Sequence, residues 1–402
     1  MIMAMKESGI EWVGLIPDTW SVIPNKYVMH KEKNLCKKWT GEEVMSLTMN
    51  GVIVRDLQNP TGKMPATFDG YQYIEDGDLL MCLFDIDVTP RCVGKVTYDG
   101  VTSPAYSNFK VHDNASRDYF YYYYLMVDNT KELLHLAKNL RHSFTEEQLG
   151  QLKVPMPPLS EQQAIADYLD ETCSKIDEII AEAKISIDEY KELKIGQINK
   201  YTIHKMKRTK LKYITEKIGD GIHATPEYSD EGTIRFINGG SFGEDSIKMI
   251  GPMLSNEEYQ KQNKSLLNEH TVMIALNGAN FGNTSLYNNE AILLGKSAGY
   301  ITLKSTVCRE YVRYCLENSV TKEAFDLSLN GTTIPNLSLN TLRNTEICLP
   351  DYSVQKQLAR TIKKMIIKMD SLIAEKESLI NDLEAYKKSL IYEVVTGKRR
   401  VV

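Results

Sequence analysis

An internal repeat constrains the fold of this chain more than any other feature of its sequence. Residues 160–182 align with residues 353–375 at a shift of 193 positions, with eight identical residues, and most of the others exchange apolar for apolar or polar for polar. Three extra residues then bring Tyr190-Lys191 onto Tyr386-Lys387. Shorter matches occur upstream in the same order: 117–119 with 309–311, and 26–28 with 212–214. Self-similarity at one distance indicates a structural unit that occurs twice.

Each copy has a mixed segment followed by a long amphipathic one. Apolar runs at 78–84 and 271–276, bounded by Gly, Asn and Pro, predict buried strands. Shorter helices are expected at 119–140 and 311–327. The aromatic run 119–124 suggests base stacking, but its counterpart in the second copy favours a helix that faces the core.

The long segments predict helices with the apolar repeat of a coiled coil. Each follows a proline segment, and Ser160 and Ser353 are expected N-caps. The predicted interface residues are Ile165, Leu169, Ile176, Ile179 and Ile187 in the first helix, and Leu358, Ile362, Met365, Met369, Leu372, Leu379, Leu383 and Leu390 in the second. Ala183, Tyr190 and Tyr386 continue the same pattern.

Opposite charge favours pairing of the two helices within one chain. Residues 156–205 carry 6 Lys+Arg and 10 Asp+Glu, a net of −4, and residues 351–402 carry 11 and 7, a net of +4. An antiparallel pair would relate the two halves by a pseudo-twofold axis. The alternatives are that each helix lies on its own domain or mediates homodimerisation.

We therefore predict an α+β fold with two similar globular domains separated by an antiparallel coiled coil. The predicted domain limits are 1–155 and 206–350 for the globular domains, and 156–205 and 351–402 for the helices.

Composition excludes several classes of protein. The net charge of −5 does not suit DNA binding by bulk electrostatics alone, so binding would depend on local patches or partner subunits. No apolar run is long enough for a membrane span, and the first five residues are too short for a signal peptide, so a cytoplasmic location is expected. The seven cysteines include no C-x-x-C pair, which favours reduced, buried thiols over a zinc site.

Catalytic motifs are not found. Gly219-x-Gly221 lacks the third glycine of a nucleotide-binding loop, and no segment resembles the catalytic motif of an amino-methyltransferase. We therefore expect no catalytic residues and no metal site in this chain.

Two related but divergent domains held at a fixed distance suit the reading of a split DNA site. DNA readers contact half-sites about one helical turn apart, ~34 Å, or a multiple of it. A single chain with two different domains can read an asymmetric bipartite sequence.

Four stretches carry a resemblance to a known family. They are residues 8–17 with Trp20, residues 157–162, residues 219–226, and residues 390–397. The Pro-Pro-x-x-Glu-Gln pattern at 157–162 is the most specific, although the second copy lacks its second proline and its glutamate. Over essentially its whole length the chain resembles the specificity subunits of type I restriction-modification systems.

This resemblance implies a non-catalytic subunit with two target-recognition domains. It implies double-stranded DNA as a ligand, and two modification subunits that dock on the helices and methylate adenine. It also implies restriction subunits with translocase and nuclease activity. S-adenosylmethionine, ATP and Mg would then belong to the partners, with no cofactor in this chain.

Candidate DNA contacts lie in loops. Lys33, Lys37 and Lys38 beside Trp39 suit phosphates, although a solvated loop explains them equally well. Asn can pair with adenine and Arg with guanine, but Asn and Gly also form turns. The candidates are Lys33, Lys37, Lys38, Arg55, Lys63, Arg91, Arg141 and His142 in the first domain, and Lys210, Gly221, His223, Thr225, Asn238, Asn277 and Asn280 in the second.

Three other functions stay open on the sequence. The chain could serve another restriction-modification machine, such as a nuclease-methyltransferase with a separate specificity chain. It could be a coiled-coil scaffold with two protein-binding domains, which salt-sensitive DNA binding would distinguish. A methyltransferase is disfavoured by the missing motifs.

Overall fold

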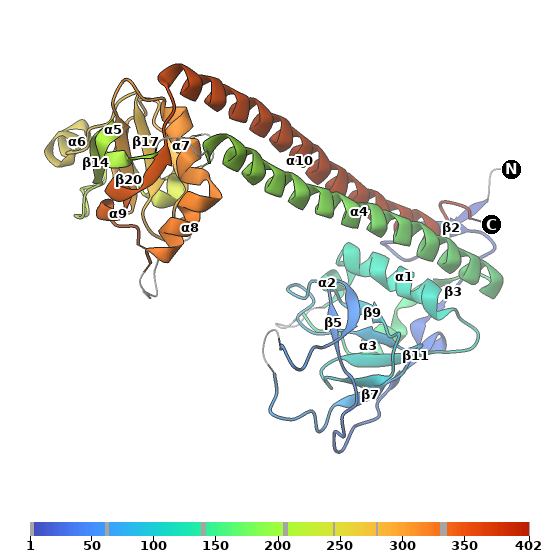
Figure 1. The fold of residues 1–402 in the computed structure, drawn as a ribbon. Helices are drawn as coiled ribbons and strands as arrows, with labels where there is room; N and C mark the ends of the chain where they lie inside the picture. Colours follow the sequence, from blue (N-terminus) through green and yellow to red (C-terminus); the bar gives the residue numbers. More distant parts are fainter. Residues whose placement is uncertain are drawn as a thin grey trace. The chain divides into compact units, whose positions relative to one another are not determined.

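A computed structural model describes residues 4–60, 64–137, 142–203, 208–243, 246–278, 280–329 and 336–401. They form two compact units: one comprises the described residues up to Ala183 together with those from Ser378 onward, and the other those within Lys184–Glu377. Both units mix helices and sheets, which confirms the α+β prediction. Each includes part of both long helices, α4 (Leu159–Thr202) and α10 (Tyr352–Val395) (Figure 1).

Among the described residues, the first unit contains two four-stranded sheets, with the orders β6-β5-β10-β7 and β4-β11-β8-β9, and the ribbons β1-β2 and β12-β3. Its strands are β1 (Met5–Glu7), β2 (Leu15–Pro17), β3 (Ser21–Pro24), β4 (Met29–Glu32), β5 (Val44–Thr48), β6 (Gly51–Val54), β7 (Gln72–Ile74), β8 (Leu79–Met81), β9 (Val93–Lys95), β10 (Gly100–Thr102), β11 (Ser107–Val111) and β12 (Lys153–Met156). Its short helices are η1 (Asn25–Tyr27), α1 (Arg117–Asn129), α2 (Glu132–Leu136) and α3 (Glu146–Gln151).

Helix α1 carries the aromatic run and faces the core. Tyr119 and Tyr123 are 0% and 1% exposed, which confirms the core-facing helix and leaves these rings unavailable for base stacking. The Ser116 hydroxyl caps the helix by accepting a hydrogen bond from the Tyr119 N–H. The helix expected over 119–140 is interrupted, because Lys131 takes a left-handed conformation (φ 54°).

The second unit has, in its described part, sheets with the orders β14-β20-β17-β18 and β16-β15-β19, and the ribbon β13-β21. Its strands are β13 (Arg208–Lys210), β14 (Thr215–Asp220), β15 (Ile234–Ile237), β16 (Met253–Leu254), β17 (Thr271–Ala275), β18 (Thr284–Leu286), β19 (Ile292–Leu294), β20 (Ala298–Leu303) and β21 (Glu346–Cys348). Its short helices are α5 (Leu211–Ile214), η2 (Gly239–Ser241), α6 (Asn256–Gln262), α7 (Arg309–Glu317), α8 (Ser319–Leu327) and α9 (Leu339–Asn344).

The strand predicted at 271–276 is confirmed by β17, and every residue of that strand is buried. The helix predicted at 311–327 is two helices. Asn318 separates α7 from α8, and its side chain accepts a hydrogen bond from the Thr321 N–H (2.8 Å) at the start of α8.

A buried glutamine fastens each long helix to the globular part of its own unit. Gln162 Oε1 accepts a hydrogen bond from the Ser116 N–H (2.8 Å), and its Nε2 donates to the carbonyl five residues upstream (2.8 Å). Gln355 repeats both contacts, with the Cys308 N–H (2.9 Å) and with the carbonyl five residues upstream (2.7 Å). Ser116 and Cys308 are the N-caps of α1 and α7, so each glutamine joins the starts of two helices.

The expectation that Ser160 and Ser353 are N-caps is wrong. Helix α4 begins at Leu159 and α10 at Tyr352, so both serines lie inside the first turn. Each helix starts three residues before its buried glutamine. The side-chain contact that both helices share near their first residue is therefore that of the buried glutamine, and not a serine cap.

The two long helices run antiparallel in both units. In the first unit, Lys387 Nζ lies 2.6 Å from Asp177 Oδ2, and in the second, Lys194 Nζ lies 2.9 Å from Asp370 Oδ1. Lys194 comes after Asp177 in α4, whereas its partner Asp370 comes before Lys387 in α10, as expected for antiparallel helices. The repeat shift of 193 relates Asp177 to Asp370 and Lys194 to Lys387, so the two ion pairs are copies of one contact.

This symmetry corrects the repeat alignment near the end of the helices. The match of Tyr190-Lys191 with Tyr386-Lys387 requires three extra residues, whereas Lys194 and Lys387 occupy equivalent positions with none. The shift of 193 therefore continues along the helix pair.

Most of the predicted interface residues are buried or partly buried. The buried ones are Ile165, Leu169, Ile176, Ile187, Ile362, Met369 and Leu390, and the partly buried ones are Leu358, Met365, Leu372 and Leu383. Cys173, which the pattern omitted, is also buried.

Two predicted interface residues are wrong. Ile179 and Leu379 are 45% and 39% exposed, and the adjacent Ile180 and Ile380 pack in the core instead. Tyr386 is likewise exposed beside Lys387. At the first two positions the exposed residue and its packed neighbour are both apolar, so hydrophobicity alone does not distinguish the packed residue from the exposed one. At the third, the packed residue is a lysine, which an apolar pattern omits.

The two ends of the described chain meet in the first unit. A Cβ on Gly397 would lie 2.5 Å from the Pro17 ring and 3.0 Å from Trp20, and Gly397 has a left-handed φ of 71°. Lys398 Nζ donates to the Val13 carbonyl (2.8 Å). The opening and closing motifs of the sequence are therefore one packed cluster.

Replacing the buried glutamines should destabilise the units that contain them. Gln162→Leu leaves the Ser116 N–H buried without a partner, and Gln355→Leu does the same to Cys308. We expect each to lower the free energy of unfolding by about 1–3 kcal/mol. Urea denaturation measures the effect, with the exposed Gln163→Leu and Gln357→Leu as controls. Equal stability of a variant and its control would disprove the contact's importance.

Candidate nucleic-acid interface

No helix in the described ranges combines the length and the apolar character of a membrane span. The same residues contain no group of three or more His, Cys, Asp or Glu side chains able to hold a metal ion.

A cleft of about 310 Å³ lies in the second unit. Four stretches of chain line it: Asp220 and His223 at the end of β14, Leu276 and Asn277 after β17, Lys296 after β19, and residues 336–339 at the start of α9. The volume is at the lower end of the range for sites that hold a small ligand group.

Two glycines next to residues of the cleft permit close packing of neighbouring segments. A Cβ on Gly221 would lie 2.1 Å from the Leu294 carbonyl oxygen, and one on Gly295 would lie 2.3 Å from Asn238 Oδ1. Within this contact the Ile222 N–H donates to the Leu294 carbonyl (2.7 Å). Neither glycine has a positive φ, so the close approach itself excludes a side chain.

The cleft presents groups of mixed polarity. His223 Nε2 lies 2.9 Å from Asp220 Oδ2, and the imidazole is 71% exposed. Asn277, Lys296 and Asn336 make no side-chain hydrogen bond or ion pair with any other described residue. A cation, amides and a carboxylate thus face the same space.

The structure brings only two of the second-domain candidates, His223 and Asn277, into this cleft. Asn238 accepts a hydrogen bond from the Ser297 hydroxyl (3.0 Å), and Asn280 donates to the Gly240 carbonyl (3.1 Å). These two amides connect loops within the domain, so their presence is explained by the fold and does not require a DNA contact.

The other second-domain candidates lie outside the cleft. Gly221 forms the backbone contact described above, Thr225 is exposed, and Lys210 lies in β13 opposite Glu346. Lys296 and Asn336 line the cleft but were not among the candidates. An isolated lysine and an asparagine in a turn-like stretch give no distinctive pattern, because only the fold brings them together.

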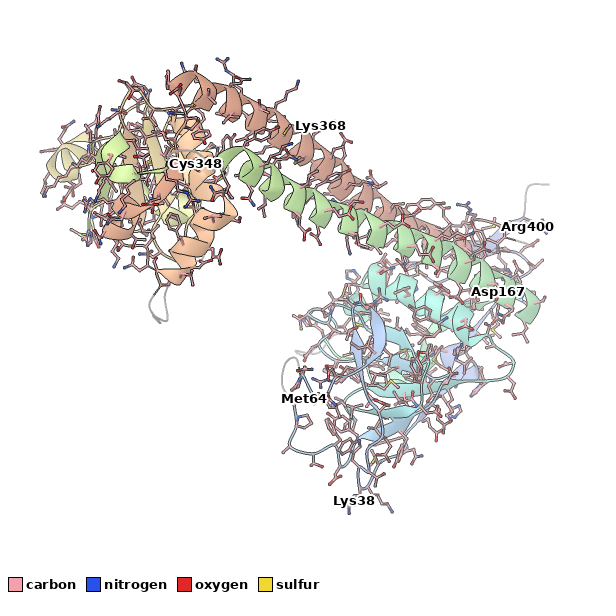
Figure 2. The ribbon with its side chains drawn as sticks, in the orientation of Figure 1. Lys38, Met64, Asp167, Cys348, Lys368 and Arg400 are labelled. Atoms are coloured by element: carbon pink, nitrogen blue, oxygen red, sulfur yellow. The ribbon has the colours of Figure 1, made fainter. Side chains whose placement is uncertain are left out.

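In the first unit, Lys33, Lys37 and Lys38 are exposed on the loop after β4. Trp39 anchors this loop, because its ring contacts Phe68 with 5.1 Å between centroids. Figure 2 shows Lys38 at the end of the first globular domain that is remote from α4. The three lysines therefore form a solvent-facing basic cluster.

The remaining first-domain candidates are dispersed. Arg55 and Arg91 are partly buried, and His142 has a left-handed φ of 42°. Lys63 and Arg141 lie outside the described residues.

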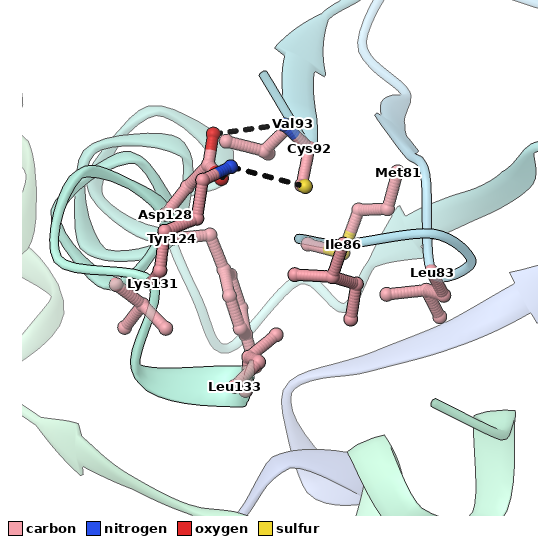
Figure 3. A pocket seen from close by; sticks show the side chains of 10 residues that line it. Met81, Leu83, Ile86, Cys92, Val93, Tyr124, Asp128, Lys131 and Leu133 are labelled. Atoms are coloured by element: carbon pink, nitrogen blue, oxygen red, sulfur yellow. Dashed lines mark hydrogen bonds and ion pairs between the residues drawn. The ribbon is translucent and has the colours of Figure 1, made fainter. Parts of the chain in front are cut away.

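A separate cavity of about 20 Å³ lies against α1 in the first unit, and Figure 3 shows its lining. Asp128 accepts a hydrogen bond from the Cys92 N–H (2.8 Å), and Lys131 Nζ lies 3.7 Å from Cys92 Sγ. Burial and the Asp128 charge raise the pKa of the Cys92 thiol to about 12, so the thiol is protonated and unreactive. The cavity has room for about one water-sized molecule and none for a base.

Comparison with known proteins agrees with the duplicated architecture. The family model for the type I restriction modification DNA specificity domain matches residues 77–189 and 194–382. The chain belongs to this family. The two matches fall one on each copy of the sequence repeat, and they confirm the predicted family.

Two curated members of the family come from Methanocaldococcus jannaschii. The type I restriction enzyme MjaVIII specificity subunit is 24% identical over 273 residues, which are 62% of this chain and 63% of that protein. The putative MjaX specificity subunit is 25% identical over 308 residues, 72% and 69% of the two chains. The match thus spans less than two thirds of the length of the MjaVIII subunit.

Solved structures share the fold. A chain from a structural study of complex assembly and conformational transition of the type I R-M system has a TM-score of 0.76 at 13% identity, covering 96% of this chain and 99% of that one. The HsdS subunit of Thermoanaerobacter tengcongensis has a TM-score of 0.57 at 15% identity, covering 96% and 98%. These likenesses confirm the predicted specificity-subunit fold.

Within this specificity-family chain, Gly221 should be required for the shape of the cleft. Gly221→Ala forces a methyl group against the Leu294 backbone, and we expect it to cost about 1–3 kcal/mol of stability. Gly240→Ala is the matched control, because a Cβ there meets nothing within 4 Å. Thermal unfolding measures both, and an equal melting temperature for the two variants would contradict the close approach.

Proposed function

We propose that this chain is the DNA-specificity subunit of a type I restriction-modification system and has no catalytic activity of its own. The repeated helix contact carries the proposal. The ion pair of Asp177 with Lys387 and its copy in the second unit give each recognition unit the same attachment to one helix pair. A reader of a split site needs two recognition surfaces on a common support.

The two units would read different half-sites, because their exposed polar groups differ. The first unit presents the basic cluster Lys33, Lys37 and Lys38, which suits phosphates. The second presents a cleft with amides, a lysine and a carboxylate, which suits base edges. The site read by the whole chain would therefore be bipartite and asymmetric.

The long helices would set the unread spacer and dock the modification subunits. Their outer faces carry exposed apolar side chains, among them Ile185 (60%), Ile195 (48%) and Ile367 (56%) in the second unit. Exposed apolar residues on long helices support a protein partner there. S-adenosylmethionine would bind to the modification subunits, and ATP and Mg to the restriction subunits.

Loop substitutions should alter only one half of the recognised sequence. Arg91→Ala in the first unit and His223→Ala in the second should each relax the motif in one half, by about tenfold or more at an affected position. Co-expression with the modification subunits, followed by genome-wide mapping of N6-methyladenine, reads out the motif. Gln163→Leu on the helix surface serves as the control. A shift of both halves by either variant would contradict separate reading.

Lengthening both helices should lengthen the spacer. One heptad inserted after Ala183 and another before Ser378 keeps the helix interface in register and adds ~10 Å at ~1.5 Å per residue. At ~3.4 Å per base pair this corresponds to about three extra base pairs. The same methylation map measures the spacer, and an unchanged spacer with both half-sites retained would disprove the measuring role.

A further inference from the structure

We propose that the cleft of the second unit reads base edges, and that Asn277, Lys296 and Asn336 are its specificity-determining residues. This inference rests on the proposed function and assigns the reading of one half-site to one surface. It adds two residues that no sequence pattern singled out.

The mixed polarity of the cleft favours bases over phosphates. A surface that only holds the backbone needs cations and neutral donors, since phosphate oxygens accept hydrogen bonds and carry negative charge. Here the Asp220 carboxylate faces the same cleft as Lys296, beside the amides of Asn277 and Asn336. In the major groove, lysine recognises guanine, asparagine recognises adenine, and a carboxylate accepts from the amino group of cytosine.

The three proposed side chains are free to bind, while the backbone that presents them is held in place. The Leu337 N–H donates to the Leu276 carbonyl (2.7 Å), and Asn277 and Asn336 form an antiparallel bridge. Lys296 follows Gly295, which is packed against Asn238. Binding would therefore break no side-chain contact of the three within the described structure.

Other asparagines of this unit provide a contrast. The amides of Asn238 and Asn280 are already engaged with Ser297 and with the Gly240 backbone. In the first copy, Phe84 occupies the position of Asn277 at the repeat shift. The cleft is thus a feature of one half-site and not of the shared scaffold.

The test is a methylation map of the assembled enzyme with Lys296→Met, and separately with Asn277→Ala plus Asn336→Ala. Each variant should lose at least tenfold discrimination at one or two positions of one half-site. The other half-site and the spacer should stay as in the wild type. Lys322→Met, an exposed lysine on α8 away from the cleft, is the control for loss of charge and should leave the motif unchanged.

Three results would overturn the inference. One is an unchanged motif at normal methylation levels. Another is a uniform fall in methylation at every site, or its complete loss, in variants that keep the wild-type melting temperature, because this would indicate a phosphate contact. The third is relaxation of both half-sites together. Failure of the proposed function itself would look different, since the wild-type chain would then direct no sequence-specific methylation.

Discussion

A lysine placed at the interface between two antiparallel helices is the contact on which the rest of this architecture depends. Lys194 and Lys387 keep only 15% and 24% of their side chains exposed, and each pairs with an aspartate of the opposite helix. Partly exposed ion pairs contribute at most about 1 kcal/mol each, so stability is not their main effect. A charged group among apolar neighbours instead disfavours other registers, because a slipped helix would leave it unpaired. Since the two contacts are related by the repeat, one register satisfies both units.

The buried glutamines attach each globular domain to its own part of the helix pair. Gln162 and Gln355 each join the start of a long helix to the cap of a domain helix, with hydrogen bonds of 2.7–2.9 Å that are shielded from water. Trp20 adds a link in the first unit, where its Nε1 donates to Glu161 Oε2 (3.0 Å). Each domain is therefore tied to its own part of the helix pair by groups that cannot move without losing buried hydrogen bonds.

Much of this architecture could be predicted from local sequence patterns, because the interface residues of long paired helices recur at regular spacings in the sequence. The repeat, the opposite charges and the antiparallel pairing follow from the residues themselves. The errors at Ile179 and Leu379 arose because each has an apolar neighbour, Ile180 or Ile380, that packs in the core instead. Ser160 and Ser353 were wrong as N-caps because their helices begin one residue earlier, three residues before a buried glutamine. The DNA-contact candidates are harder to predict. Asn277, Lys296 and Asn336 come together only through the tertiary fold, and the residues adjacent to them in sequence give no sign of it.

The same difference explains why the family is recognisable while the recognised DNA sequence is not. Gln162, Gly221 and Gly397 belong to the motifs that carry the resemblance, and each is required by packing: a buried hydrogen bond, a carbonyl at 2.1 Å, or a left-handed turn against Pro17. A residue under such constraints tolerates few substitutions whatever DNA is read. The side chains of Asn277, Lys296 and Asn336 make no such contacts within the described residues, so their identity can change without cost to the scaffold. A chain built in this way can acquire a new target by changing its cleft residues while the paired helices and glutamine contacts stay as they are.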